Sequence, residues 1–209
     1  MTKKDEKGST TGTGQVQVGK TNGVKLGTQV DREGYALNAS GDASQTKGDK
    51  STTTTAGGSV SYTDKADKDK DGKATGDDVT VTVTARGKQV KEAGGNESTN
   101  VQVGGGVKSG TTSADIKYET EGGQKDGTNY RFHDLTTAFG KTWDLDAKRK
   151  EGFKLNLGGH LRLSDVKGED VVATGDLTGS WYKGEGDDKK EFTFRLYGGQ
   201  DQLANFGSL

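Results

Sequence analysis

Apolar and polar residues alternate with a period of two in one segment of this chain after another. The clearest case is residues 79–85, where Val79, Val81 and Val83 alternate with threonines. Because successive side chains of a β-strand point to opposite faces, this alternation predicts a strand with one apolar and one polar face. Similar alternation marks residues 16–18, 24–30, 101–107, 114–118, 153–163, 171–181 and 192–196.

Turn sequences separate these segments at the spacing of single strands. Asn22-Gly23 and Asp126-Gly127 are typical of tight hairpins, and residues 94–96 mark another turn. The pattern predicts an all-β fold, an antiparallel up-and-down meander of about twelve strands, and favours a large β-barrel because closure removes the exposed sheet edges. Such a barrel is too wide for side chains to fill, so closure implies a lumen. Residues 135–140 fit a strand or a helical turn, and residues 200–206 fit a short helical turn.

The chain contains neither Pro nor Cys among its 209 residues. Proline removes a donor from the hydrogen-bond ladder, so its absence suits long uninterrupted hairpins. Without cysteine, the chain can form neither a disulfide framework nor a thiol metal site.

Composition divides the chain into a leader and one domain. Residues 1–13 are rich in Lys, Gly and Thr and are predicted to be a flexible leader. Residues 14–209 are predicted to form a single antiparallel β domain. The character of its core is expected to change near residue 128, because every Phe and Trp lies beyond that point.

Charge excludes one class of partner. Lys and Arg number 30 against 31 Asp and Glu, and the two signs are interspersed. A nucleic-acid-binding surface needs a basic patch or stripe, so no nucleic-acid partner is expected.

The strongest chemical motif is the segment 67–78, which reads DKDKDGKATGDD. It resembles the twelve-residue calcium loops of EF-hand-like proteins, with alternating acids, Gly at position six and an acid at position twelve. Two departures are Asp rather than Glu at position twelve and strands rather than helices on either side. The alternative is a solvated loop in which lysines neutralise the acids. The resemblance implies as ligands the side chains of Asp67, Asp69, Asp71 and Asp78, the carbonyl of Lys73, and Thr75 through a water.

Two other features are expected to carry no chemistry. Residues 14–21 match the phosphate-loop pattern, but that motif needs a helix after the glycine-rich turn, and a strand is predicted there. His133 and His160 lie on different strands, without acids or thiols nearby in sequence, and are predicted to be solvated.

These observations favour a non-enzymatic, soluble or secreted bacterial β-barrel module with a structural or binding role, stabilised by calcium. It would be extracellular or on the cell surface and bind an unidentified ligand or protein. The alternative is a porin-like membrane-spanning pore in the outer membrane. Residues 52–62, nearly all Thr, Ser and Gly, argue against a lipid-facing surface. Aromatic residues near strand ends would form the girdle of such a pore: Tyr35, Tyr62, Trp181, Tyr182 and Tyr197.

Overall fold

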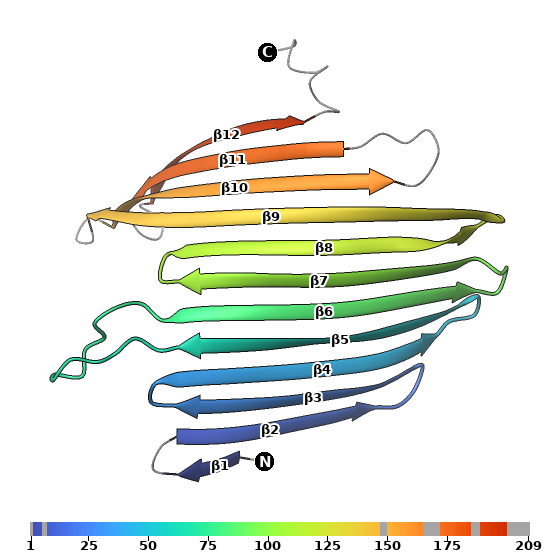
Figure 1. The fold of residues 1–209 in the computed structure, drawn as a ribbon, viewed down its shortest axis with the longest axis horizontal. Helices are drawn as coiled ribbons and strands as arrows, with labels where there is room; N and C mark the ends of the chain where they lie inside the picture. The colour runs from blue at the N-terminus through green and yellow to red at the C-terminus, as the bar shows by residue number, and fades with distance from the viewer. Residues whose placement is uncertain (1, 6–7, 147–149, 165–171, 185–188, 200–209) are drawn as a thin grey trace.

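Each strand of the computed structural model pairs with its neighbours in sequence, which gives one antiparallel sheet in the order β1 to β12 (Figure 1). The structure describes residues 2–5, 8–146, 150–164, 172–184 and 189–199. The strands are β1 Thr2–Asp5, β2 Gly8–Gln17, β3 Thr21–Arg32, β4 Tyr35–Lys47, β5 Ser51–Asp64, β6 Val79–Glu92, β7 Glu97–Ser109, β8 Thr112–Lys125, β9 Thr128–Asp146, β10 Glu151–Ser164, β11 Val172–Lys183 and β12 Lys190–Gly199.

The predicted all-β antiparallel meander is confirmed. The described sheet is open, with β1 and β12 at its two edges, so closure into a barrel stays a prediction. Residues 135–140 lie inside β9, which resolves their ambiguity in favour of a strand. The helical turn predicted for residues 200–206 lies outside the described residues.

The sheet begins earlier than the sequence predicts. β1 and the start of β2 lie within residues 1–13, which the sequence predicts to be a flexible leader. Backbone groups supply the ladder hydrogen bonds whatever the side chain, so a Thr- and Gly-rich segment can pair along a sheet edge. Thr10, for example, lies opposite Val30 of β3.

The first hairpin turn is displaced from its predicted position. Asn22 and Gly23 lie inside β3, and the chain turns at residues 18–20 instead. The Asn22 side chain accepts a hydrogen bond from the backbone N–H of Gly19 at 3.1 Å. In this register Val16 lies opposite Val24, so the pairing of apolar residues on one face overrides the local turn preference. A strand follows residues 14–21, as predicted, so these residues lack the helix of a phosphate loop.

The register keeps the two faces of the sheet distinct from end to end. Pairing is continuous in every described hairpin except for one shift between Glu151 and Gly152 of β10. Residues opposite each other share a face, so each row of partners runs across the strands on one side of the sheet. Nothing in this pattern changes at residue 128, where β9 begins and pairs with β8 in register.

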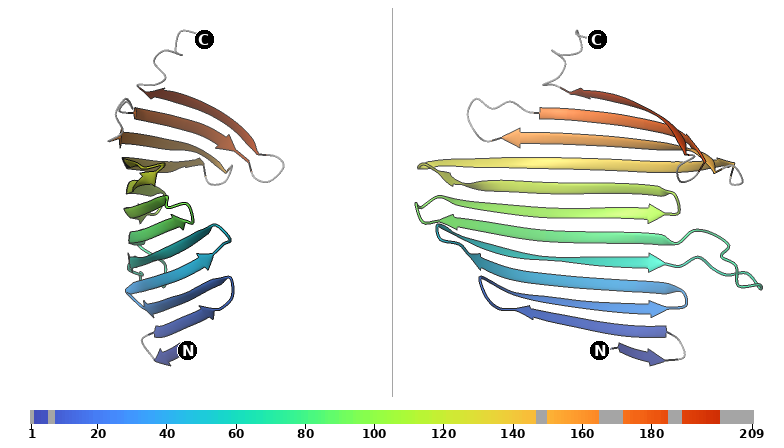
Figure 2. Two further views of the ribbon diagram at one scale, coloured as in Figure 1. Left: turned by 90° about the vertical axis from the view of Figure 1, so that its right-hand side faces the viewer. Right: turned by 180° about the vertical axis from the view of Figure 1, so that it is seen from behind.

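The sheet is a single layer. Figure 2 shows the strands turning progressively along the sheet, with β10–β12 bending away from the earlier strands. Among the described residues no apolar side chain is buried. Both faces of the sheet are therefore uncovered within the described part of the chain.

Candidate functional site

The apolar residues of nearly every strand meet in a continuous stripe on one face, which we call the apolar band. It consists of the three rows of cross-strand partners that pass through Val81, Val83 and Ala85 of β6. From β2 to β12 the described residues of these rows include no Lys, Arg, Asp, Glu or His, although 29% of the chain is charged; at the β1 edge the row through Val81 reaches Lys3, which pairs with Thr10. The row through Val81 contains Val30, Leu37, Tyr62, Val107, Ala114, Phe139, Leu157, Leu177 and Leu196.

The band is open to its surroundings. Val83 and Ile116 are each 54% exposed, and Leu196 is 63% exposed. Apolar side chains continue for a few positions beyond the three rows on several strands, from residue 79 to 85 on β6 and from residue 153 to 163 on β10. The band runs from β2 to β12, whereas soluble monomers rarely expose large contiguous apolar patches.

Aromatic residues gather along one margin of the band, at the sheet end that includes the loop of residues 65–78. We call this end the long-loop end. Tyr35 stacks on Tyr62 with ring centroids 6.1 Å apart, and Trp143 lies 5.9 Å from Phe153. The indole N–H of Trp181 donates to Glu151 Oε1 at 3.1 Å, so this ring has an apolar body and a polar tip.

Two of the five aromatics predicted for a girdle lie elsewhere. Tyr182 and Tyr197 are on the polar face, where Tyr182 donates to Asp144 Oδ1 at 2.9 Å. Trp143 and Phe153 join this margin instead, although their place in it was not predicted. Their alternation with polar residues was visible in the sequence, but whether they lie level with Tyr35 along the strand direction depends on the register.

The opposite face contains a row of charged residues, which we call the charged row. Arg86 Nη2 lies 3.8 Å from Asp42 Oδ2, and Glu119 receives a hydrogen bond of 2.6 Å from the Asn100 amide. The row runs from Gln15 of β2 to Val172 of β11 and contains between them Lys25, Asp42, Gly57, Arg86, Gln102, Glu119, Asp134 and Arg162. Its signs are mixed, and most of its charges have an opposite charge nearby.

His160 belongs to this polar network. Its Nε2 lies 2.7 Å from Asp134 Oδ1, and Arg162 Nε lies 3.8 Å from the same oxygen. The sequence predicted a solvated histidine here, but not its carboxylate partner, which is 26 residues away in the chain. His133 lies on the apolar face, where its Nδ1 is 2.7 Å from the Tyr118 hydroxyl.

Hydroxyl side chains cover the polar face of the earlier strands. They pair directly across the strands, with Ser40 and Ser59 oxygens 2.9 Å apart and Thr63 and Thr80 oxygens 2.9 Å apart. This half of the polar face is hydrophilic with few charges.

The predicted calcium loop folds into a small hairpin that projects beyond the sheet (Figure 1). Asp69 Oδ1 accepts the backbone N–H groups of Asp71 and Lys73 at 3.0 and 2.8 Å, and the Lys73 carbonyl accepts the N–H of Asp69. Asp78 Oδ1 instead accepts the N–H of Ala66. In the described part of the chain no group of three His, Asp or Glu side chains is placed to hold a metal ion.

The proposed ligands therefore bond mainly to the loop itself. Thr75 donates its hydroxyl to the Asp67 carbonyl at 2.9 Å, which further closes the hairpin. Calcium would have to compete with these contacts and rearrange the loop. Calcium binding there stays a prediction.

None of the described residues forms a helix long and apolar enough to cross a membrane. No protein-family model matches the chain, and neither a curated protein nor a solved structure matches it.

Proposed function

We propose that this chain is a membrane-spanning β-barrel that forms a passive, non-enzymatic pore. The observation that carries the proposal is the apolar band, whose described rows contain no charged residue from β2 to β12. A lipid-facing barrel surface needs an apolar belt of this kind, flanked by aromatic residues.

The length of the apolar stretch supports a lipid environment. A membrane-spanning strand tilted by about 45° needs about 9–11 residues to cross the hydrocarbon. On β10 the apolar positions run from Phe153 to Leu163, which matches that length.

The aromatic margin supports the same environment. Tyr and Trp favour the membrane interface because their rings are apolar and their N–H or O–H groups are polar. Trp181, with its N–H bonded to Glu151, has this arrangement at the margin of the band.

The Thr- and Gly-rich segment of β5 fits a lipid-facing surface better than its composition suggests. Within the apolar band its positions are Gly58, Val60 and Tyr62, whereas Ser59 and Ser61 lie on the polar face. The lipid-facing positions of this segment in the band are therefore uncharged and lack Ser and Thr. This removes the main sequence argument for the soluble module over the pore.

An inverted barrel, with the apolar face inside, is less favourable. Eight strands already give an interior that side chains just fill, so twelve would leave a wide apolar cavity. With the polar face inside, the lumen would instead be lined by the charged row and the hydroxyl side chains and could hold water. The mixed signs of the charged row favour a pore of weak ion selectivity.

A pair of lysine substitutions on adjacent residues tests the proposal. Val83→Lys places a charge in the middle of the apolar band, and Thr84→Lys places the same charge on the polar face. A lysine at the bilayer midplane costs about 2–4 kcal/mol. We expect the wild type and Thr84→Lys to insert into lipid vesicles and conduct ions in planar bilayers, with Val83→Lys inserting poorly.

The soluble module predicts the opposite behaviour. A chain that is monodisperse and melts cooperatively in detergent-free buffer, and that does not associate with vesicles, would contradict the pore.

A further inference from the structure

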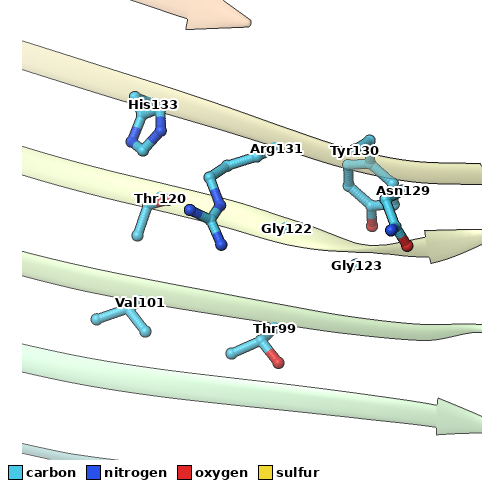
Figure 3. Close-up of a pocket in the computed structure, with 9 residues that line it drawn as sticks. All are labelled: Thr99, Val101, Thr120, Gly122, Gly123, Asn129, Tyr130, Arg131 and His133. Atoms are coloured by element: carbon cyan, nitrogen blue, oxygen red, sulfur yellow. The ribbon is translucent and has the colours of Figure 1, made fainter. Parts of the chain in front are cut away.

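A shallow hollow of about 800 Å³ lies on the apolar face of β7, β8 and β9 (Figure 3). It lies beside the apolar band, at the margin away from the long-loop end. Gly122 and Gly123 line it together with Thr99, Arg131 and His133. The row of Thr99, Gly122 and Arg131 lies two rows beyond the band row that contains Tyr118. The hollow is therefore where this face changes from apolar to polar.

Arg131 is the unusual side chain of the hollow. Figure 3 shows it reaching from β9 across β8, with its guanidinium between Thr120 and Gly122. A Cβ at Gly122 would lie 3.5 Å from Arg131 Nε and 3.7 Å from its Cγ, so the glycine lets the side chain lie close against β8. Within the described residues, Arg131 has neither an ion pair nor a hydrogen bond from its guanidinium.

The other described arginines differ from Arg131 in this respect. Arg86, Arg162 and Arg195 each lie within 4 Å of a carboxylate oxygen, and Arg32 donates to Ser9 and Asp31. Arginine presents five N–H donors in a planar fork that matches phosphate and carboxylate oxygens. Arg131 thus offers this fork unused, on the same face of the sheet as the apolar band.

His133 supplies a second donor beside Arg131. The Tyr118 hydroxyl lies 2.7 Å from His133 Nδ1, and the two rings stack at 6.1 Å. With the hydroxyl as donor, the neutral imidazole carries its proton on Nε2, which can then donate to a ligand. In that tautomer Arg131 and His133, two residues apart on β9, both present donors at the margin of the apolar band.

We infer that this hollow binds the phosphate group of an anionic membrane lipid, with Arg131 and His133 donating to the phosphate oxygens. The acyl chains of that lipid would lie along the band, over Tyr118 and Leu135. The inference rests on the proposed pore, because it requires the band to face lipid. A phosphate joined to hydrocarbon matches the junction of cationic and apolar surface better than a free anion does.

Native mass spectrometry of the full chain in detergent tests this inference. Phosphatidylglycerol is titrated against phosphatidylcholine, and retained lipid is counted for the wild type, Arg131→Gln and Arg195→Gln. Arg195 lies on the polar face beside Asp176, so Arg195→Gln is a matched control. Charge-assisted hydrogen bonds are strong enough that we expect Arg131→Gln to bind phosphatidylglycerol about tenfold more weakly. The control should bind it like the wild type.

Three results would overturn the inference, and they are distinguishable. Equal retention by Arg131→Gln and the wild type, with both still conducting ions, overturns the lipid site and leaves the pore intact. Failure of the wild type to enter vesicles overturns both. Inorganic phosphate that shifts the Gly122 and Gly123 amide resonances as strongly without lipid as phosphatidylglycerol does would identify free phosphate as the ligand.

Discussion

Arg86 on β6 and Asp42 on β4 form an ion pair across the intervening strand, with 3.8 Å between Arg86 Nη2 and Asp42 Oδ2. Gly57 of β5 lies between them in the register. A Cβ at that glycine would lie 3.4 Å from both Cβ and Cγ of Arg86. The absence of a side chain at Gly57 thus lets two charges on non-adjacent strands meet.

We expect Gly57→Val to separate this ion pair and reduce the conductance of the pore. The valine would fill the space beside Arg86 and narrow the lumen. Loss of the ion pair itself should change stability by less than about 1 kcal/mol, because exposed ion pairs contribute little. Single-channel conductance and reversal potential measure the effect. Gly41→Val, on the apolar face, is the control and should conduct like the wild type; equal currents in all three proteins would contradict the proposed lumen.

Both tryptophans of the chain, Trp143 and Trp181, lie at the aromatic margin. In vesicles, brominated lipids should quench their fluorescence most when the bromine is close to the headgroup, because the interface is where such rings reside. Trp181→Phe isolates Trp143 and should keep the same depth profile. Quenching that is strongest at the bilayer centre, or absent, would contradict the assigned margin.

Closure of the sheet predicts a short distance between its two ends. In the open sheet β2 and β12 are ten strand spacings of about 4.8 Å apart, roughly 48 Å. Spin labels on Thr13→Cys and Thr193→Cys should instead report a distance of about 20 Å or less in lipid, where a closed barrel leaves no free edge. The chain has no cysteine of its own, so only these sites are labelled. Labels on Thr11→Cys and Gln29→Cys, which are paired residues, give the short-distance reference.

The calcium hypothesis can be tested independently of the pore. If residues 67–78 bind calcium, millimolar calcium should raise the melting temperature of the wild type, and Asp69→Ala with Asp71→Ala should abolish that rise without unfolding the protein in chelator. Asp69→Asn is the matched control for the structure of the loop, since its amide oxygen can still accept the N–H groups of Asp71 and Lys73. A calcium-dependent rise that survives in the double variant would exclude this loop as the site.

The strands could be predicted from sequence largely because their alternation is local. The Val79–Ala85 part of β6 is visible from its own residues. The hairpin turn predicted at Asn22-Gly23 was wrong, because the local turn preference competed with the cross-strand pairing of Val16 and Val24. Only the register reveals that pairing.

The candidate site was harder to predict for the same reason. Asp134 and His160 are polar-face residues by their own alternation, but their contact depends on how β9 and β10 align. The apolar band likewise follows from aligning every strand at once. A single alternating strand cannot show whether its apolar residues continue those of its neighbours.

The pairing of each strand with its sequence neighbour also shapes how such a chain would fold. Every hairpin joins residues close in the chain, so strand pairing can proceed one hairpin at a time with a small entropic cost at each step. Joining β1 to β12 is different, because it closes a loop that includes nearly the whole chain. That last step would set the folding rate, and until it occurs the two unpaired edges would be open to pairing with other copies of the chain.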